Sequence, residues 1–294
     1  MEQTYYSIII GALLFEYALS TVSALLNMKS ITSDIPEDFK NHYDEEKYSQ
    51  SQSYLKDKTK FGLFSGTFSL TLTLLVIHTG IFGHIDTMAP RFSDNSVVHG
   101  LVFFGIIFLV NDIINLPFSI YNTFKIEEKY GFNKTTPALF ISDKLKGYGL
   151  TIVLGSAIIV PVLYFFNAYA NNGWWIAWLI VIGFIIAVQP LFVNVIAPIF
   201  NKFEPLSSGE LRDAIESFAK KVDFPIGRID VMDGSRRSAH SNAYFSGYGK
   251  SRRIALFDTL LDKHSTEEIV SVVAHEVGHY KKKHILLGTS LGIL

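Results

Sequence analysis

Five long apolar segments limit the fold of this chain more than any other feature of its sequence. They cover residues 5–26, 61–82, 97–121, 149–166 and 174–196. A helix of about 20 residues rises about 30 Å, which matches the hydrocarbon core of a bilayer. The pattern therefore predicts a multi-span α-helical membrane protein with five complete spans. A sixth apolar run, residues 285–294, is too short to cross, and we interpret it as the start of a further transmembrane helix in a longer protein.

The composition is that of a chain that faces lipid in some parts and water in others. Hydrophobic residues make up 49% of the chain and aromatic residues 14%. The formal net charge of −1 gives no excess that would indicate a nucleic-acid partner, so we expect the lipid bilayer and no nucleic acid. Cysteine is absent, which excludes disulfide bonds, a cysteine nucleophile and a thiolate metal site.

Basic residues alternate between the loops that connect the five segments. The first and third loops are rich in lysine, whereas the second holds only Arg91 and the fourth holds none. The region after the fifth segment is again rich in lysine and arginine. By the positive-inside rule, this alternation predicts an N-terminus outside and residues 197–284 on the cytoplasmic side of the membrane.

Residues 200–284 have the pattern of a small α+β domain. Apolar residues recur at helical spacing over Glu210–Val222. Alternation predicts three strands, at Arg228–Met232, Asn242–Tyr248 and Arg252–Asp258. Gly249-Lys250-Ser251 separates the last two and suggests a hairpin. We therefore expect a transmembrane helical domain over 1–199, the α+β domain over 200–284, and the start of another transmembrane helix over 285–294.

A helix that begins near Ser265 carries the residues with the clearest chemistry. Ser265 and Glu268 have the spacing of a capping box, which marks a helix start. His275 and His279 stand four residues apart, so both imidazoles project from one face of this helix. Two imidazoles are half of a typical catalytic zinc site, and Glu276 beside them can act as the base toward a water molecule.

The sequence around this H-E-x-x-H motif favours a metal site over the alternative of two surface histidines on an amphipathic helix. Its neighbours are uncharged, as expected for a helix buried beneath a metal: Val272, Val273, Ala274, Val277 and Gly278. We therefore predict a zinc metalloendopeptidase with one zinc ion per chain. Its metal ligands are His275 and His279, and its catalytic residue is Glu276.

A catalytic zinc normally takes a third protein ligand, and the local sequence offers weak candidates for it. His284 lies nine residues after His275, about 900° of rotation, and would face the opposite side if the helix continued. Asp258 and Asp262 are weaker candidates still. We expect the third ligand beyond residue 294, as a glutamate on a later helix.

Polar residues inside the apolar segments leave a non-enzymatic alternative open. Asp112 lies within apolar sequence, and Gln189, Pro190, Asn194 and Pro198 predict a kink in the fifth helix. A channel or transporter with an inactive protease-like domain could use such features. No repeat of the span pattern between the two halves supports it, although transporters often show one.

Several stretches outside the metal motif resemble a known family, the zinc-dependent CAAX prenyl endopeptidases (type I CAAX prenyl proteases, integral-membrane metalloproteases). They extend over most of the chain, at 126–135, 201–206, 240–245 and 254–260. The family fold has seven transmembrane helices around a large water-filled chamber. The resemblance implies that His275 and His279 bind zinc, that Glu276 is the base, and that a downstream glutamate completes the zinc site.

The resemblance also implies the substrate and the location. The strand that holds Asn242, Ala243 and Tyr244 would lie along the substrate backbone, with Asn242 bonded to it, as in strand addition. The expected reaction removes the last three residues of a prenylated CaaX protein. A membrane-protein quality-control protease of broader specificity is the alternative. The expected location is the endoplasmic reticulum membrane in a eukaryote, or the inner (plasma) membrane in a bacterium, with the protease domain cytoplasmic.

Overall fold

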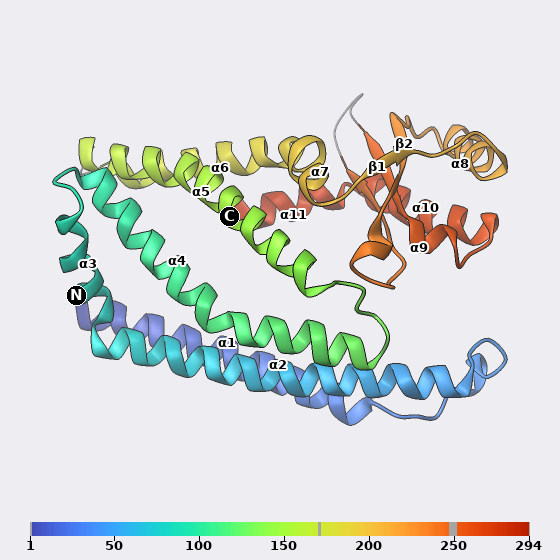
Figure 1. The fold of residues 1–294 in the computed structure, drawn as a ribbon, viewed down its shortest axis with the longest axis horizontal. Coiled ribbons are helices and arrows are strands. Elements are labelled where there is room, and N and C mark those ends of the chain that lie inside the picture. Colours follow the sequence, from blue (N-terminus) through green and yellow to red (C-terminus); the bar gives the residue numbers. More distant parts are fainter. Residues whose placement is uncertain (1, 170–171, 247–251, 294) are drawn as a thin grey trace. The chain divides into compact units, whose positions relative to one another are not determined.

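The computed structural model describes residues 2–169, 172–246 and 252–293, and these form two compact units (Figure 1). The first unit is Met1–Tyr130 and the second is Gly131–Leu294. The first unit contains only helices. The second contains further long helices and a four-stranded sheet.

The first unit is built from three long helices and shorter connecting ones. They are α1 (Glu2–Ser30), η1 (Glu37–Phe39), α2 (Glu45–Thr79), α3 (Ile81–Met88), η2 (Ala89–Arg91), α4 (Ser96–Tyr121) and the π-helical turn η3 (Asn122–Glu127). Asp44 caps α2 by accepting from the backbone N–H of Lys47 at 2.9 Å. Gly80, at φ 69°, ends α2 in the left-handed conformation that glycine adopts without strain. The helix boundaries in this unit thus follow local sequence signals.

The second unit begins with two long helices. These are α5 (Pro137–Ala168) and α6 (Gly173–Leu191), and α6 continues through the π-helical turn η4 (Phe192–Ile196) into α7 (Ala197–Phe200). The segments Gly173–Val188 and Phe192–Phe200 are bent by 46°, which confirms the predicted kink. Pro190 cannot donate a backbone hydrogen bond, and Asn194 Nδ2 donates to the Pro190 carbonyl at 2.9 Å inside the bend.

The membrane-spanning character expected from the apolar segments is confirmed. Among the described residues, four helices are long and apolar enough to cross a membrane: Gln3–Ser30, Glu45–Thr79, Ser96–Glu127 and Pro137–Ala168. The bent pair that starts at Gly173 makes a fifth if it is counted as one span. α11 (His284–Ile293) is the last helix described.

The sheet of the second unit has four strands in the order β1-β2-β4-β3. They are β1 (Phe203–Pro205), β2 (Arg228–Met232), β3 (Ala243–Ser246) and β4 (Arg253–Phe257). β2 and β4 pair in parallel, and the other two pairs are antiparallel. The antiparallel pairing of β3 with β4 agrees with the predicted hairpin, whose turn at residues 249–251 lies outside the described residues.

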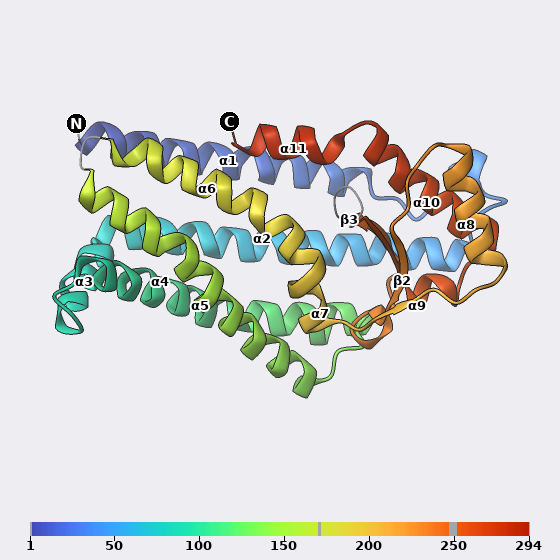
Figure 2. The ribbon, with the colours of Figure 1, turned by 90° about the horizontal axis from the view of Figure 1, so that it is seen from above.

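Helices α8 (Glu210–Lys221) and α10 (Thr266–Lys281) cover one face of this sheet, and α9 (Asp258–Leu261) follows β4 (Figures 1 and 2). Alternate strand residues and one stripe of each helix form the core: Ile229, Ala243, Ile254, Leu256, Ile215, Ala219, Ile269, Val273 and Val277. Residues 269, 273 and 277 are one helical turn apart, so α10 buries one face and leaves the opposite face free for other roles.

The opposite face of the sheet carries a buried ion pair. The Asp230 carboxylate is fully buried and lies 2.7 Å from Arg253 Nε and 3.0 Å from Arg228 Nη2. Arg253 Nη1 also donates to the Val193 carbonyl of η4 at 3.2 Å. These contacts pair the buried charge and join the sheet to the end of the bent helix.

Candidate functional site

The start of α10 is defined by a complete capping box. The Ser265 hydroxyl accepts from the backbone N–H of Glu268 at 3.4 Å, and the Glu268 carboxylate accepts from the backbone N–H of Ser265 at 2.8 Å. This hydrogen bond from the Ser265 backbone lowers the pKa of Glu268 below its usual value. The predicted helix start is confirmed, and it sets the rotation of every residue downstream on α10.

The two histidines of the motif meet on the face of α10 that points away from the core. His275 Nε2 and His279 Nε2 are 3.0 Å apart, and their rings lie edge to face. Both side chains are exposed, and Glu276 between them is half-buried. Of the uncharged neighbours, Val273 and Val277 are buried in the core, Val272 packs against it, and Gly278 is exposed.

α10 does not continue past Lys281, which changes the position expected for His284. Lys283 adopts φ 55°, a left-handed conformation that breaks the helix, and α11 begins at His284. His284 Nδ1 lies 2.9 Å from His279 Nδ1 as a result. Sequence analysis placed His284 on the opposite side only for a helix that continued, and this condition is not met.

A pocket of about 330 Å³ lies beside His279 and His284. Its lining residues are Phe245 from β3, Glu276, His279 and Tyr280 from α10, and His284. The Phe245 and Tyr280 rings lie edge to face, with centroids 5.4 Å apart. Tyr280 was not among the residues predicted for the site, and Phe245 was expected only as part of the strand along which substrate would lie. Strand alternation gives a signal for Phe245, since it falls on the same face as the buried Ala243.

The histidine pair fits two ligand positions of a zinc ion. Zinc–nitrogen bonds are about 2.0–2.1 Å long, so two Nε2 atoms 3.0 Å apart can direct their lone pairs at one ion. Across residues 2–169, 172–246 and 252–293, no group of three or more His, Cys, Asp or Glu side chains is placed to hold a metal. Asp258, one weak candidate for third ligand, is engaged elsewhere and accepts from the backbone of Ser235 and Thr259 at 2.8 Å each. Asp262, the other weak candidate, belongs to no such group either.

The strand predicted to hold substrate is at the end of the sheet. β3 pairs with β4 on one side, and the strand order leaves its other edge without a strand partner among the described residues. Asn242 precedes β3, and its Oδ1 accepts from the backbone N–H of Ala243 at 2.9 Å. Its carbonyl accepts from the Phe257 N–H at 3.0 Å. Ala243 is buried in the core beneath α10.

Tyr244 points to the face of the sheet opposite α10. Its hydroxyl lies 4.0 Å from Met232 Sδ, and its ring lies edge to face with Phe257. Burial there raises the pKa of the Tyr244 phenol. The Tyr244 side chain thus does not line the pocket, and the β3 side chain that does is that of Phe245.

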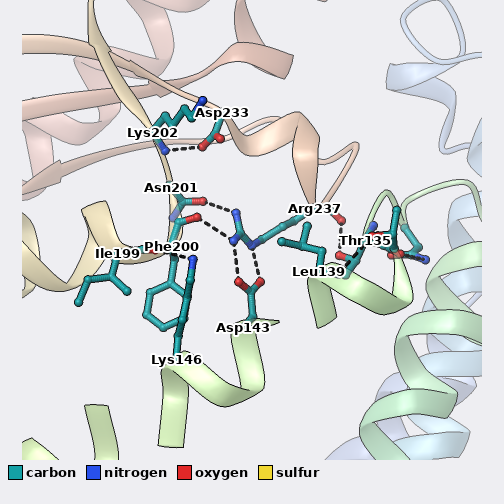
Figure 3. Close-up of polar contacts among 12 residues, drawn as sticks. Thr135, Leu139, Asp143, Lys146, Ile199, Phe200, Asn201, Lys202, Asp233 and Arg237 are labelled. Atoms are coloured by element: carbon teal, nitrogen blue, oxygen red, sulfur yellow. Dashed lines mark hydrogen bonds and ion pairs between the residues drawn. The ribbon is translucent and has the colours of Figure 1, made fainter. Parts of the chain in front are cut away.

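Arg237 anchors the loop that leads from β2 to β3 (Figure 3). Its guanidinium forms a bidentate pair with Asp143 of α5, at 2.8 and 2.9 Å, and donates to Asn201 Oδ1 and to the Phe200 carbonyl. Its own carbonyl accepts from the Thr135 hydroxyl at 3.1 Å. This one residue therefore joins α5, the end of α7 and the loop before β3.

Comparison with known proteins gives the family. A family model described as "CAAX prenyl protease N-terminal, five membrane helices" matches residues 24–202, and one described as "Peptidase family M48" matches residues 205–294. The chain belongs to the CAAX prenyl protease family of M48 peptidases. This membrane metalloprotease family accounts for both the helical region and the H-E-x-x-H helix, and it confirms the resemblance seen in the sequence.

Individual relatives of this M48 protease agree. CAAX prenyl protease 1 of Saccharomyces cerevisiae is 38% identical over 267 residues, which cover 86% of this chain and 58% of that protein. The Homo sapiens homolog of CAAX prenyl protease 1 is 32% identical, with coverage of 86% and 62%. The crystal structure of S. mikatae Ste24p superposes with a TM-score of 0.90 at 35% identity, covering 98% of this chain and 70% of that one. The chain thus spans roughly 60% of the length of the Saccharomyces cerevisiae and Homo sapiens relatives.

Proposed function

We propose that this M48 protein takes part in zinc-dependent hydrolysis of a peptide bond near the C-terminus of prenylated CaaX proteins. The observation that carries the proposal is the grouping around one pocket of Glu276, His279 and His284, with His275 Nε2 only 3.0 Å from His279 Nε2. An exposed histidine pair beside a carboxylate, at the edge of a sheet, has the chemistry of a metallopeptidase site.

In this proposal His275 and His279 hold the zinc ion through their Nε2 atoms. When bound, the ion acts as a Lewis acid that polarises the scissile carbonyl and acidifies a water molecule. The Glu276 carboxylate accepts a proton from the attacking water and passes it to the leaving amine. The family resemblance implies a downstream glutamate as third ligand, and none of the described residues fills that position.

The free edge of β3 is the surface we assign to the peptide. An extended peptide can pair with an unpartnered strand edge, where main-chain hydrogen bonds hold it straight. β3 lies next to α10, and Phe245 of this strand lines the pocket with Glu276. A peptide paired there would have its backbone within reach of the carboxylate. Asn242, Ala243 and Tyr244 provide the backbone along which it would lie.

The membrane location follows the same reasoning. The protein is a multi-pass membrane protein, and the named relatives come from eukaryotes. We therefore place it in the endoplasmic reticulum membrane, with residues 197–284 in the cytoplasm as the positive-inside rule predicts.

The test compares a farnesylated CaaX peptide with its unprenylated twin, using the purified full-length protein and its Glu276→Gln variant. We expect about one zinc ion per chain in both proteins, and cleavage of the farnesylated peptide only by the unsubstituted one. Equal cleavage of both peptides would indicate a broader quality-control protease. Absence of zinc and of cleavage in the full-length protein would overturn the proposal.

A further inference from the structure

A second cavity lies in the first unit, where two helices change from polar to apolar sequence. α2 is charged as far as Lys60 and apolar from Phe61, and α4 is apolar to its end at Tyr121 before Lys125 follows in η3. The rings of Phe61 and Tyr121 stack with centroids 5.1 Å apart. Both helices therefore make this change at the same level, which is where a membrane surface would lie.

The polar side of this level is held together by cross-helix contacts. Lys58 Nζ donates to Glu127 Oε1 at 2.9 Å and to Asn122 Oδ1 at 2.9 Å. Lys129 Nζ lies 2.6 Å from Asp57 Oδ2. These pairs fix α2 against η3 and the residues just after it, and they neutralise both of the carboxylates that take part in them.

The cavity beside these contacts measures about 850 Å³, within the range of a site for a small-molecule ligand. Aromatic and apolar side chains form most of its wall, and charged side chains form the remainder: Phe61, Phe64, Pro117, Phe118, Tyr121, Ile126, Asp57, Lys60, Lys125 and Lys129. Phe64 is 63% exposed and Tyr121 51% exposed, so these rings are available to a ligand.

The charged part of the wall is positive. Three lysines and one aspartate line the cavity, and Lys129 is the lysine that pairs with this aspartate, Asp57. Lys60 and Lys125 are exposed, and within the described part of the chain neither forms an ion pair. The cavity thus offers two available ammonium groups directly beside an aromatic wall.

We propose that this cavity binds an acidic phospholipid, with its phosphate between Lys60 and Lys125 and its acyl chain along Phe61, Phe64 and Phe118. Basic pockets between transmembrane helices bind anionic head groups on the cytoplasmic side of membranes, and each lysine near such a surface strengthens binding. The aromatic wall explains why the ligand has an apolar tail, since a free anion would gain nothing from contact with these rings.

The experiment measures lipid binding to the detergent-purified full chain by native mass spectrometry. The probes are phosphatidylserine, phosphatidylcholine with the same acyl chains, and inorganic phosphate. We expect the double variant Lys60→Gln/Lys125→Gln to bind phosphatidylserine about 25-fold more weakly, at about fivefold for each lysine. Phe64→Ser should weaken the binding of both lipids, because it removes part of the surface for the tail.

Two further variants keep the test decisive. Lys47→Gln/Lys56→Gln removes two exposed α2 lysines that do not line the cavity, so it should leave lipid binding unchanged. Lys60→Arg/Lys125→Arg keeps the charge and should restore binding. Equal weakening by the control pair, or full binding by the glutamine pair, would overturn the proposal. Inorganic phosphate that competes as well as phosphatidylserine would overturn the assignment to a lipid.

Discussion

The imidazole of His284 lies against that of His279, with their Nδ1 atoms 2.9 Å apart and their ring centroids 4.9 Å apart. This contact uses the ring nitrogen of His279 that the metal would not use. If Nε2 of His279 is to offer a lone pair, its Nδ1 must carry the proton and donate it, and His284 Nδ1 is in position to accept. In the proposed zinc site, His284 would therefore position the ligand His279 and would not itself bind the metal.

Replacement of His284 tests this arrangement. We expect His284→Ala to weaken zinc binding by about 10- to 100-fold, the usual cost of removing a group that orients a metal-bound histidine. Competition with a calibrated zinc chelator measures the affinity directly, without reference to activity. His42→Ala, at an exposed histidine outside the second unit, is the control and should bind zinc normally.

The role of Asn242 can be separated from its local hydrogen bond. Asn242→Asp keeps an oxygen that can accept from the Ala243 N–H, but it removes the amide donor that would reach a substrate backbone. We expect kcat/KM to fall about tenfold, equivalent to about 1.4 kcal/mol for one lost hydrogen bond. An unchanged kcat/KM, with zinc content and thermal stability preserved, would remove Asn242 from the proposed substrate contacts.

The Arg237–Asp143 pair should contribute to the stability of the second unit. Asp143→Asn retains the shape of the side chain but loses the charge in two partly buried hydrogen bonds. We expect a loss of about 1–3 kcal/mol in the free energy of unfolding, measured by thermal denaturation in detergent. Asp262→Asn changes the same kind of group at an exposed position and should leave stability unaltered within about 0.5 kcal/mol.

The capping box predicts a pH dependence of stability. The folded pKa of Glu268 is lowered, so its carboxylate stabilises the folded state above the unfolded pKa of about 4.3. That contribution is lost as pH falls through the lowered folded pKa. The difference in Tm between the unsubstituted protein and Glu268→Ala should therefore be constant above about pH 5 and shrink below about pH 4. A difference that grows on acidification would contradict this assignment.

Local signals in the sequence predicted much of this structure. Apolar periodicity predicted α8, the Ser265–Glu268 spacing predicted the start of α10, and apolar length predicted the spanning helices. β1 was not predicted, because three residues ending in Pro205 carry no alternation long enough to recognise. The parallel pairing of β2 with β4 depends on long-range contacts that no local pattern shows.

The position of His284 was missed for a different reason. A lysine gives no sign that it will adopt a left-handed conformation, which glycine or asparagine would have suggested. An unbroken α10 would turn His284 away from His275. The break at Lys283 instead brings His284 against His279. Phe245 and Tyr280 belong to the pocket because of how β3 and α10 pack, which depends on the whole core.

The break at Lys283 also allows the tilt of α11 to affect a histidine of α10. α11 starts at the residue that contacts His279, so a change in the tilt of this apolar helix would move the His284 ring before it disturbed the core beneath α10. The thickness and composition of the bilayer act on helix tilt. The surrounding lipid could therefore change the orientation of His279, which we assign to the metal.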